Sequence, residues 1–248
     1  MNLCLDIGNT RTKAAVFGEQ NQMLQHLTYT GLPTPDEIIQ LIEQYHIINA
    51  IVSSVGTHHL ALIESIKENI FLVLLSSQTP IPITNAYQTP QTLGNDRLAA
   101  VVGAHDKFPQ TDLLVIDAGT CITYDYINAN GSYLGGAISP GISIKFKALH
   151  TFTQQLPFID ININEIDFPA LVGNNTYNSI LSGVIVNTIS EIDGTIERYK
   201  QEYNIHKVIL TGGDTFFFEN RLKNRIFACP NLVPEGLNKI LQYNVGNI

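Results

Sequence analysis

Short apolar runs alternate with one-sided apolar stripes along this chain. Seven runs rich in Val, Ile and Leu are bounded by Gly, Asn, Asp or Pro, a pattern typical of buried strands. These runs are Leu3–Ile7, Thr12–Phe17, Ala50–Val55, Phe71–Leu75, Leu113–Ile116, Cys121–Ile127 and Val208–Thr211. Apolar stripes with helical spacing follow Pro35, Asp96 and Asn175. Strands that alternate with helices predict an α/β fold.

One short pattern occurs twice. Asp6-Ile7-Gly8 and Asp117-Ala118-Gly119 each end an apolar run, and each leads through a threonine into a second run. Each copy predicts a tight β-hairpin with an aspartate at the end of its first strand. The copies lie 117 − 6 = 111 residues apart. We therefore expect two similar halves, residues 1–112 and 113–248, with a ligand cleft between them.

Charge and composition exclude some classes of partner and of protein. Lys and Arg total 14 and Asp and Glu total 22, which gives a net charge of −8. This balance argues against nucleic acid or an anionic membrane as the main partner, because both attract a basic face. Hydrophobic residues make up 44% of the chain and charged residues 15%, which excludes intrinsic disorder.

The cellular compartment is suggested by cysteine usage and by the apolar runs. Cys4, Cys121 and Cys229 are far apart and odd in number, which fits a reducing cytoplasm. We find no signal-peptide pattern at Met1. The apolar run at residues 70–75 is far shorter than the roughly 20 residues that cross a bilayer. We expect a cytoplasmic protein without a membrane partner.

The first hairpin carries residues suited to phosphate chemistry. Gly8 lets backbone N–H groups approach a phosphate closely, and Thr10 and Thr12 can add hydroxyl donors. Lys13 supplies a positive charge on the next strand. Asp6 can hold Mg²⁺, directly or through water, because Mg²⁺ prefers oxygen ligands and keeps several waters. The alternative is an ordinary β-turn.

The second hairpin repeats this arrangement. Thr120 can donate to a phosphate, and Asp117 can present a carboxylate to the same cleft. Two glycine-rich segments could also approach a ligand: a predicted turn at Gly135–Gly141, and Thr211–Asp214, against which a purine or ribose could lie. Each segment alone is equally compatible with a simple turn.

The sequence Gly94-Asn95-Asp96-Arg97 marks the start of a predicted helix. Asp96 is either the N-cap carboxylate of that helix or a general base for a substrate hydroxyl, and the two roles are compatible. Arg97 could bind a carboxylate in bidentate fashion.

Three common kinds of site are absent from the sequence. It has no GxxxxGK[ST] motif, which excludes a P-loop enzyme. Its seven histidines lack the paired spacing of zinc ligands. No GxSxG or Cys/His arrangement points to a covalent nucleophile.

In their order along nearly the whole chain, these motifs resemble the type III pantothenate kinases of bacteria. Further matching segments are Ser53-Ser54-Val55, Tyr87, Asn175-Thr176 and Glu235-Gly236-Leu237. The resemblance implies two similar domains of the actin-like, ribonuclease-H-like type. It also implies ATP-dependent phosphorylation of pantothenate to 4'-phosphopantothenate, the first step of coenzyme A biosynthesis.

The resemblance implies roles for single residues as well. The implied ATP contacts are Asp6, Ile7, Gly8, Asn9, Thr10, Arg11, Thr12, Lys13 and Thr120. The implied pantothenate contacts are Tyr87, Gly94, Asn95, Asp96, Arg97 and Thr176. Asp96 is the implied proton acceptor, and Asp117 the implied ligand of a monovalent cation, K⁺ or NH₄⁺. A homodimer that completes its substrate pocket across the interface rests on the resemblance alone.

Two other functions stay compatible with the residues. The same fold could phosphorylate a sugar or another small acid, which a panel of substrates would decide. The chain could also be a nucleotide-binding regulator without catalysis. Loss of Asp6, Asp96 or Asp117 would indicate such a regulator, and all three are present.

Overall fold

The computed structural model describes residues 1–8, 11–54, 60–67, 70–163 and 165–246. The chain divides into two compact units. Unit 1 contains Met1–Pro109, Gly131–Tyr133 and Asn231–Ile248, and unit 2 contains Gln110–Asn130 and Leu134–Pro230. The expectation of halves at residues 1–112 and 113–248 stays a prediction.

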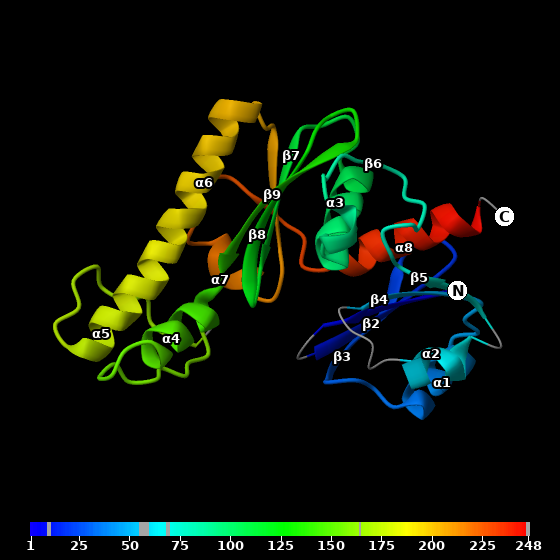
Figure 1. Cartoon of the computed structure of the whole chain (residues 1–248), viewed down its shortest axis with the longest axis horizontal. Coiled ribbons are helices and arrows are strands. Elements are labelled where there is room, and N and C mark those ends of the chain that lie inside the picture. Colours follow the sequence, from blue (N-terminus) through cyan, green and yellow to red (C-terminus); the bar gives the residue numbers. More distant parts are fainter. Residues whose placement is uncertain (9–10, 55–59, 68–69, 164, 247–248) are drawn as a thin grey trace. The chain divides into compact units, whose positions relative to one another are not determined.

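Unit 1 is built on a five-stranded sheet with the strand order β3-β2-β1-β4-β5 (Figure 1). Its strands are β1 (Asn2–Ile7), β2 (Arg11–Phe17), β3 (Met23–Thr30), β4 (Asn49–Ser54) and β5 (Phe71–Leu74). The central strand β1 is antiparallel to β2 and parallel to β4. Because side chains alternate along a strand, Leu3, Leu5 and Ile7 share one face. They form a core with α1 (Pro35–Gln44) and α2 (Leu60–Ile66).

Two helices of unit 1 cross with their backbones in close contact. They are α3 (Asn95–Lys107) and α8 (Leu232–Val245), and α8 also contacts β1, β2 and β4. A Cβ atom at Gly236 would lie 1.8 Å from the Ala99 carbonyl oxygen, and one at Gly103 would lie 2.6 Å from the Leu232 carbonyl oxygen. Glycine is therefore required at this crossing, which fixes the helix that carries Asp96.

Unit 2 repeats the strand order of unit 1, as β9-β8-β7-β10-β11. Its strands are β7 (Leu113–Ala118), β8 (Cys121–Ile127), β9 (Ser132–Pro140), β10 (Lys207–Thr211) and β11 (Phe227–Ala228). The central strand β7 is antiparallel to β8 and parallel to β10. Two sheets of one topology confirm the predicted α/β fold with two similar units.

A long helical segment covers one face of the sheet of unit 2 (Figure 1). It consists of α5 (Thr176–Leu181), a π-helical turn (Ser182–Val186) and α6 (Asn187–Tyr203). Helices α4 (Ile142–Thr151) and α7 (Thr215–Glu219) contribute to the same core.

The first two residues of β9 belong to unit 1. Ser132 and Tyr133 pair in parallel with β6 (Thr84–Asn85), which precedes the short 3₁₀ helix Pro90–Thr92. The predicted turn at Gly135–Gly141 is wrong, because Gly135 and Gly136 lie within β9. A Cβ atom at Gly136 would lie 1.6 Å from the Tyr124 carbonyl oxygen, so glycine here allows close strand approach instead.

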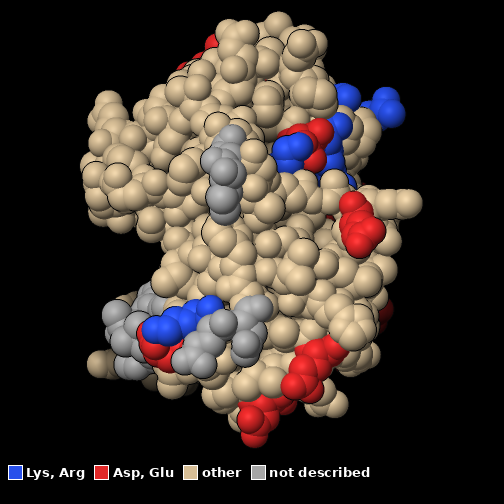
Figure 2. Space-filling model, turned by 90° about the vertical axis from the view of Figure 1, so that its right-hand side faces the viewer, with Lys and Arg blue, Asp and Glu red and all other residues tan. Residues whose placement is uncertain are grey.

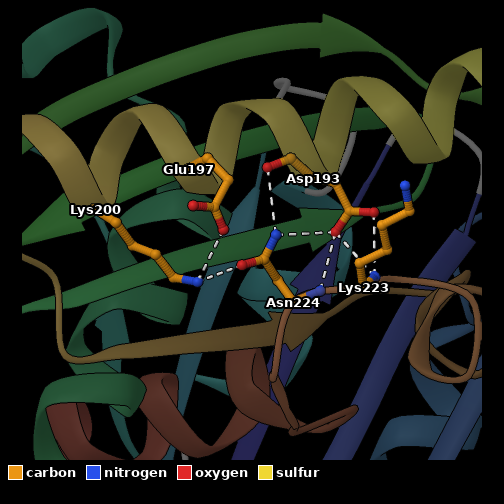
Figure 3. A network of polar contacts seen from close by, with 5 residues as sticks. All are labelled: Asp193, Glu197, Lys200, Lys223 and Asn224. Atoms are coloured by element: carbon orange, nitrogen blue, oxygen red, sulfur yellow. Dashed lines mark hydrogen bonds and ion pairs between the residues drawn. The ribbon is translucent and has the colours of Figure 1, made fainter.

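A buried aspartate anchors the loop between α7 and β11 to helix α6 (Figure 3). Asp193 is only 9% exposed. Its carboxylate accepts hydrogen bonds from the backbone N–H groups of Lys223 and Asn224, each at 3.1 Å, and from the Asn224 side-chain amide at 3.0 Å. On the same helix, Lys200 forms an exposed ion pair with Glu197 and also contacts Asn224.

Charged side chains are sparse on the surface shown in Figure 2, where they gather in small groups. This agrees with the low share of charged residues, 15%. Within the part of the chain that the structure describes, none of the helices has the length and apolar character of a membrane span.

Candidate active site

The first predicted hairpin joins β1 and β2 in unit 1. The Gly8 N–H donates to the Arg11 carbonyl oxygen at 3.0 Å and closes the turn. Asn9 and Thr10, both predicted ATP contacts, lie outside the described residues. The hairpin predicted from the repeated Asp-x-Gly pattern is therefore present, with Asp6 near the end of β1.

Asp6 lies in a cluster of polar and charged side chains. It pairs in register with Lys13 on β2 and with Ser53 on β4. The Ser53 hydroxyl donates to Asp6 Oδ1 at 3.1 Å. Burial raises the pKa of Asp6, the nearby Asp96 carboxylate raises it further, and Lys13 and the Ser53 hydrogen bond lower it.

The donor set of this cluster fits a divalent cation. Asp6 and Asp96 are close enough to repel each other, and Lys13 offsets only part of that repulsion. Carboxylate oxygens are the ligands that Mg²⁺ prefers in proteins. A cation beside Asp6 would remove the penalty that raises its pKa.

Asp96 lies in the first turn of helix α3 but does not cap it. The prediction that it is the N-cap residue is wrong: Gly94 occupies that position, and Asp96 is the second residue of the helix. Its exposed carboxylate accepts a hydrogen bond from the Arg97 backbone N–H at 2.8 Å. A Cβ atom at Gly94 would lie 2.5 Å from Asp96 Oδ1, so glycine there makes room for the carboxylate.

Two further predicted substrate contacts pack together beside Asp96. The Arg97 guanidinium carbon lies 5.7 Å from the centre of the Tyr87 ring, and Arg97 is only 6% exposed. The Tyr87 ring stacks on the fully buried Tyr133 ring, with centroids 6.1 Å apart. Arg97 and Tyr87 thus form one supported wall next to the carboxylate.

The remaining residues of the first hairpin have different surroundings. Ile7 and Thr12 are buried, whereas Arg11 is exposed. The Thr12 hydroxyl donates to the carbonyl oxygen of Gly31, the residue after β3, at 2.7 Å, so this hydroxyl is already engaged with protein in this conformation.

The second predicted hairpin joins β7 and β8 in unit 2. The Gly119 N–H donates to the Cys121 carbonyl oxygen at 2.9 Å, and Thr120 is exposed at the turn. The Gly141 N–H donates to the Thr120 carbonyl oxygen at 3.0 Å. The segment at Gly141 therefore lies against the turn of the second hairpin.

Gly212 lies directly against the second hairpin. It has a φ of +99°, and a Cβ atom there would lie 2.3 Å from both Asp117 Oδ1 and the Ala118 carbonyl oxygen. The Asp214 N–H donates to the Ala118 carbonyl oxygen at 2.9 Å. Burial raises the pKa of Asp214 to about 6. The side-chain and backbone oxygens here suit a hard cation.

Thr176 lies on a different part of unit 2. It is the exposed first residue of α5. The residue before it, Asn175, caps this helix: its side chain accepts a hydrogen bond from the Asn178 N–H at 2.9 Å.

Sequence reasoning missed two contributors to the site in unit 1. Tyr133 supports Tyr87 from a strand 46 residues away, and no local pattern marks that pairing. The Leu75 carbonyl oxygen accepts a hydrogen bond from the Asn95 side-chain amide at 3.1 Å. A backbone acceptor leaves no signal in a sequence. Asn95 also borders a cavity of about 200 Å³ with Leu93 and Leu98.

Comparison with known proteins shows which folds and sequences this chain resembles. Solved structures share the fold over nearly the whole chain. A Baf-family protein of Campylobacter jejuni, described as a transcriptional activator, has a TM-score of 0.63 at 24% identity and covers 98% of this chain and 99% of its own. A ROK family glucokinase of Streptomyces griseus, solved with glucose and AMPPNP, has a TM-score of 0.54 at 12% identity, with 98% of each chain covered.

Sequence relatives are closer. The type III pantothenate kinase of Bacteroides fragilis is 43% identical, and that of Flavobacterium johnsoniae is 39% identical, each over 100% of both chains. The family model for type III pantothenate kinase matches residues 2–198. This chain therefore belongs to the type III pantothenate kinase family.

Proposed function

We propose that this chain transfers the γ-phosphoryl group of ATP to the primary hydroxyl of pantothenate, the reaction for which its family is named, and that Asp96 is the general base. The observation that supports the residue roles is the charge cluster of unit 1. Asp6, Lys13 and Asp96 are close enough to shift one pKa, and they lie beside the wall formed by Arg97 and Tyr87.

The chemistry asks for alignment and charge neutralisation. Phosphoryl transfer passes through a loose transition state, and the protein contributes mainly by positioning groups and stabilising charge. Lys13 and the hairpin N–H groups would stabilise the negative charge of the transferred phosphoryl group. Asp6 would hold Mg²⁺, directly or through water, and bound Mg²⁺ would neutralise the phosphate oxygens of ATP.

Asp96 suits a base that acts late in the reaction. It is exposed on the first turn of α3, and its hydrogen bond to the Arg97 N–H fixes the carboxylate without burying it. A loose transition state asks little of the base until the new bond forms. Arg97 and Tyr87 would hold the polar groups of pantothenate, which carries a carboxylate.

Unit 2 would bind the nucleotide. Thr120 would donate to a phosphate, and the turn at Gly212 would accept the ribose or purine against its backbone. Asp117 would bind K⁺ or NH₄⁺. The Asp117 carboxylate and the Ala118 carbonyl oxygen both lie against Gly212, and together they offer oxygen donors for a hard cation.

We also propose that the protein is a homodimer. Phe168, Leu171 and Val172 lie within five residues of one another in unit 2 and are 53%, 76% and 81% exposed. Contiguous exposed apolar surface marks interaction sites. Thr176 follows this segment, which fits its predicted contact with pantothenate in a pocket completed by a second copy.

A substrate panel tests the proposed function. Purified protein is incubated with Mg²⁺-ATP and K⁺, and ADP release is measured with pantothenate, pantetheine, glucose or N-acetylmannosamine as acceptor. We expect turnover that depends on pantothenate and a product heavier by one phosphoryl group. Equal ADP release with and without pantothenate would overturn the substrate assignment. Turnover with a sugar alone would favour the alternative kinase.

A further inference from the structure

Asn95 precedes Asp96 in the chain, and its side chain is engaged with protein. Its amide Nδ2 donates to the carbonyl oxygen of Leu75, 20 residues earlier, at 3.1 Å. We infer that Asn95 is a positioning residue, which ties the first turn of α3 to the end of β5 and so holds the Asp96 carboxylate in place relative to Asp6. This inference rests on the proposed role of Asp96.

The two residues that flank Asn95 contribute differently. Gly94, the N-cap residue of α3, has no side chain to bond the free N–H groups of the first turn. The Asp96 carboxylate bonds the N–H of its own neighbour, Arg97, so that bond moves with the helix. The Asn95 amide instead reaches a different structural element.

The acceptor of this bond is fixed to the central sheet. The Leu75 N–H donates to the Val52 carbonyl oxygen of β4 at 2.9 Å. The next residue of β4, Ser53, donates its hydroxyl to Asp6. Hydrogen bonds and one strand therefore connect Asn95 to the residue beside Asp6. The position of Asp96 and the position of Asp6 are therefore both linked to strand β4.

The middle of α3 is held by a different contact. Gly103 and Gly236 bring the backbones of α3 and α8 together at Ala99 and Gly103. The first turn of α3 lies before this contact, so it can shift while the contact stays. Without the Asn95 bond, we expect the first turn to move while α3 stays folded. A misplacement of about 1 Å in a reacting group costs about 10²-fold in rate.

The competing role for Asn95 is a direct contact with pantothenate. Removing a contact made equally in ground and transition states raises KM and leaves kcat unchanged. Loss of a tether on the base instead lowers kcat, because substrate still binds but the proton acceptor is misplaced. The kinetic constants of one variant therefore separate the two roles.

Three variants make the comparison. Asn95→Ala removes the hydrogen bond, and Asn95→Leu removes it while keeping the number and branching of the side-chain heavy atoms. Asn244→Ala is the matched control: the Asn244 amide also donates to a carbonyl oxygen of this region, that of Pro80 at 2.9 Å, but from helix α8. We expect both Asn95 variants to lower kcat about tenfold to a hundredfold with a pantothenate KM within threefold of wild type. We expect Asn244→Ala to keep wild-type kcat.

A double-mutant cycle with Asp96→Asn gives the decisive result. If Asn95 acts through Asp96, Asn95→Ala lowers kcat in the wild-type background but by less than about twofold when Asp96 is already replaced. Equal losses in both backgrounds, a pure rise in KM, or wild-type kcat in the Asn95 variants would overturn the inference. Wild-type activity of Asp96→Asn alone would instead overturn the proposed general base. Thermal midpoints measured in parallel identify misfolded variants, and Asn95→Leu replaces Asn95→Ala in the cycle if the latter does not fold.

Discussion

The two Asp-x-Gly hairpins share a scaffold and differ in their neighbours. In unit 1, Asp6 pairs with Lys13 on one side and Ser53 on the other. In unit 2, Asp117 pairs with Thr123 and Thr211 at the equivalent positions. One carboxylate therefore has a cationic neighbour, whereas the strand neighbours of the other are two threonines.

This difference shows how a repeated topology can acquire two chemistries. The strand order places a carboxylate at the end of each central strand, and the residue opposite it decides the local charge. We propose that Lys13 and Asp96 give the first hairpin its role in phosphoryl transfer. In the same proposal, Gly212, packed against Asp117 and Ala118, gives the second hairpin its role in binding a cation and a nucleotide.

The two units also differ in what holds their helices. In unit 1, α3 and α8 meet through backbone contacts at Gly103 and Gly236. In unit 2, the carboxylate of Asp193 holds the loop after α7 (Figure 3). The contact between α3 and α8 requires glycine at the crossing, whereas the loop after α7 is held by one buried carboxylate.

The largest expected difference between the two hairpins is in their effect on turnover. Lys13→Ala removes the cation beside Asp6, and we expect kcat to fall about 10²–10³-fold, as when one preorganised charge-stabilising group is lost. Thr123→Ala changes the equivalent position of the second hairpin and should leave kcat within about threefold of wild type. Steady-state kinetics at saturating ATP measure both. Similar losses in the two variants would contradict a division of chemistry between the hairpins.

A smaller effect, on the free energy of unfolding, is expected from the Asp193 carboxylate, which holds the loop between α7 and β11. Asp193→Ala leaves two backbone N–H groups and one side-chain amide without their acceptor. We expect a loss of about 3 kcal/mol in the free energy of unfolding, since bonds to a buried charge are involved. Glu197→Ala on the same helix breaks only an exposed ion pair and should cost less than about 1 kcal/mol. Urea unfolding measures both, and equal costs would show that the Asp193 network is not an anchor.

Two glycine-to-alanine substitutions are expected to change the stability of the protein in opposite directions. Gly236→Ala places a methyl group against the Ala99 carbonyl oxygen, and we expect it to destabilise the protein by about 1–3 kcal/mol. Gly194→Ala lies on an exposed position of α6 with open space around it, and we expect it to stabilise by about 0.5–1 kcal/mol. Thermal unfolding of the two variants in one buffer checks this. A neutral Gly236→Ala would contradict the tight crossing.

The smallest expected effect is a shift in the pKa of Asp6. Because burial and then Asp96 raise the pKa of Asp6, Asp96→Asn should lower that pKa, and Lys13→Ala should raise it. NMR titration of the labelled Asp6 carboxyl carbon without divalent cation measures these shifts. The raised pKa also means that ionising Asp6 costs stability, so its contribution falls as pH rises from the pKa of the unfolded chain through that of the folded one. No response to Asp96→Asn would mean that the two carboxylates are separate.

Local sequence patterns predicted much of the fold. They predicted few of the contacts between residues that are far apart in the sequence. The hairpins at Asp6 and Asp117 follow from strand periodicity and turn residues within a few positions, and both are present. The pairing of β6 with the start of β9, which brings Tyr133 to Tyr87, joins segments far apart in the sequence. Its free energy comes from tertiary packing, which a periodicity argument does not contain.

The same limit applies at the start of α3. The pattern placed the helix start within two residues of its observed position and offered Asp96 as the cap, because aspartate is a frequent N-cap residue. The structure assigns it to Gly94, since the Asp96 carboxylate occupies the space that a side chain there would need. The preference of aspartate for the N-cap position is a local property of the sequence. The room for a side chain at that position depends on three-dimensional contacts.

The most direct test of the account compares binding and turnover in Asp96→Asn. Calorimetry gives its affinity for pantothenate in the presence of a non-hydrolysable ATP analogue, and a coupled assay gives kcat. The account predicts an affinity within a few-fold of wild type and a kcat lowered about 10²–10⁴-fold, as expected for a lost general base. A kcat equal to that of the wild type would contradict it.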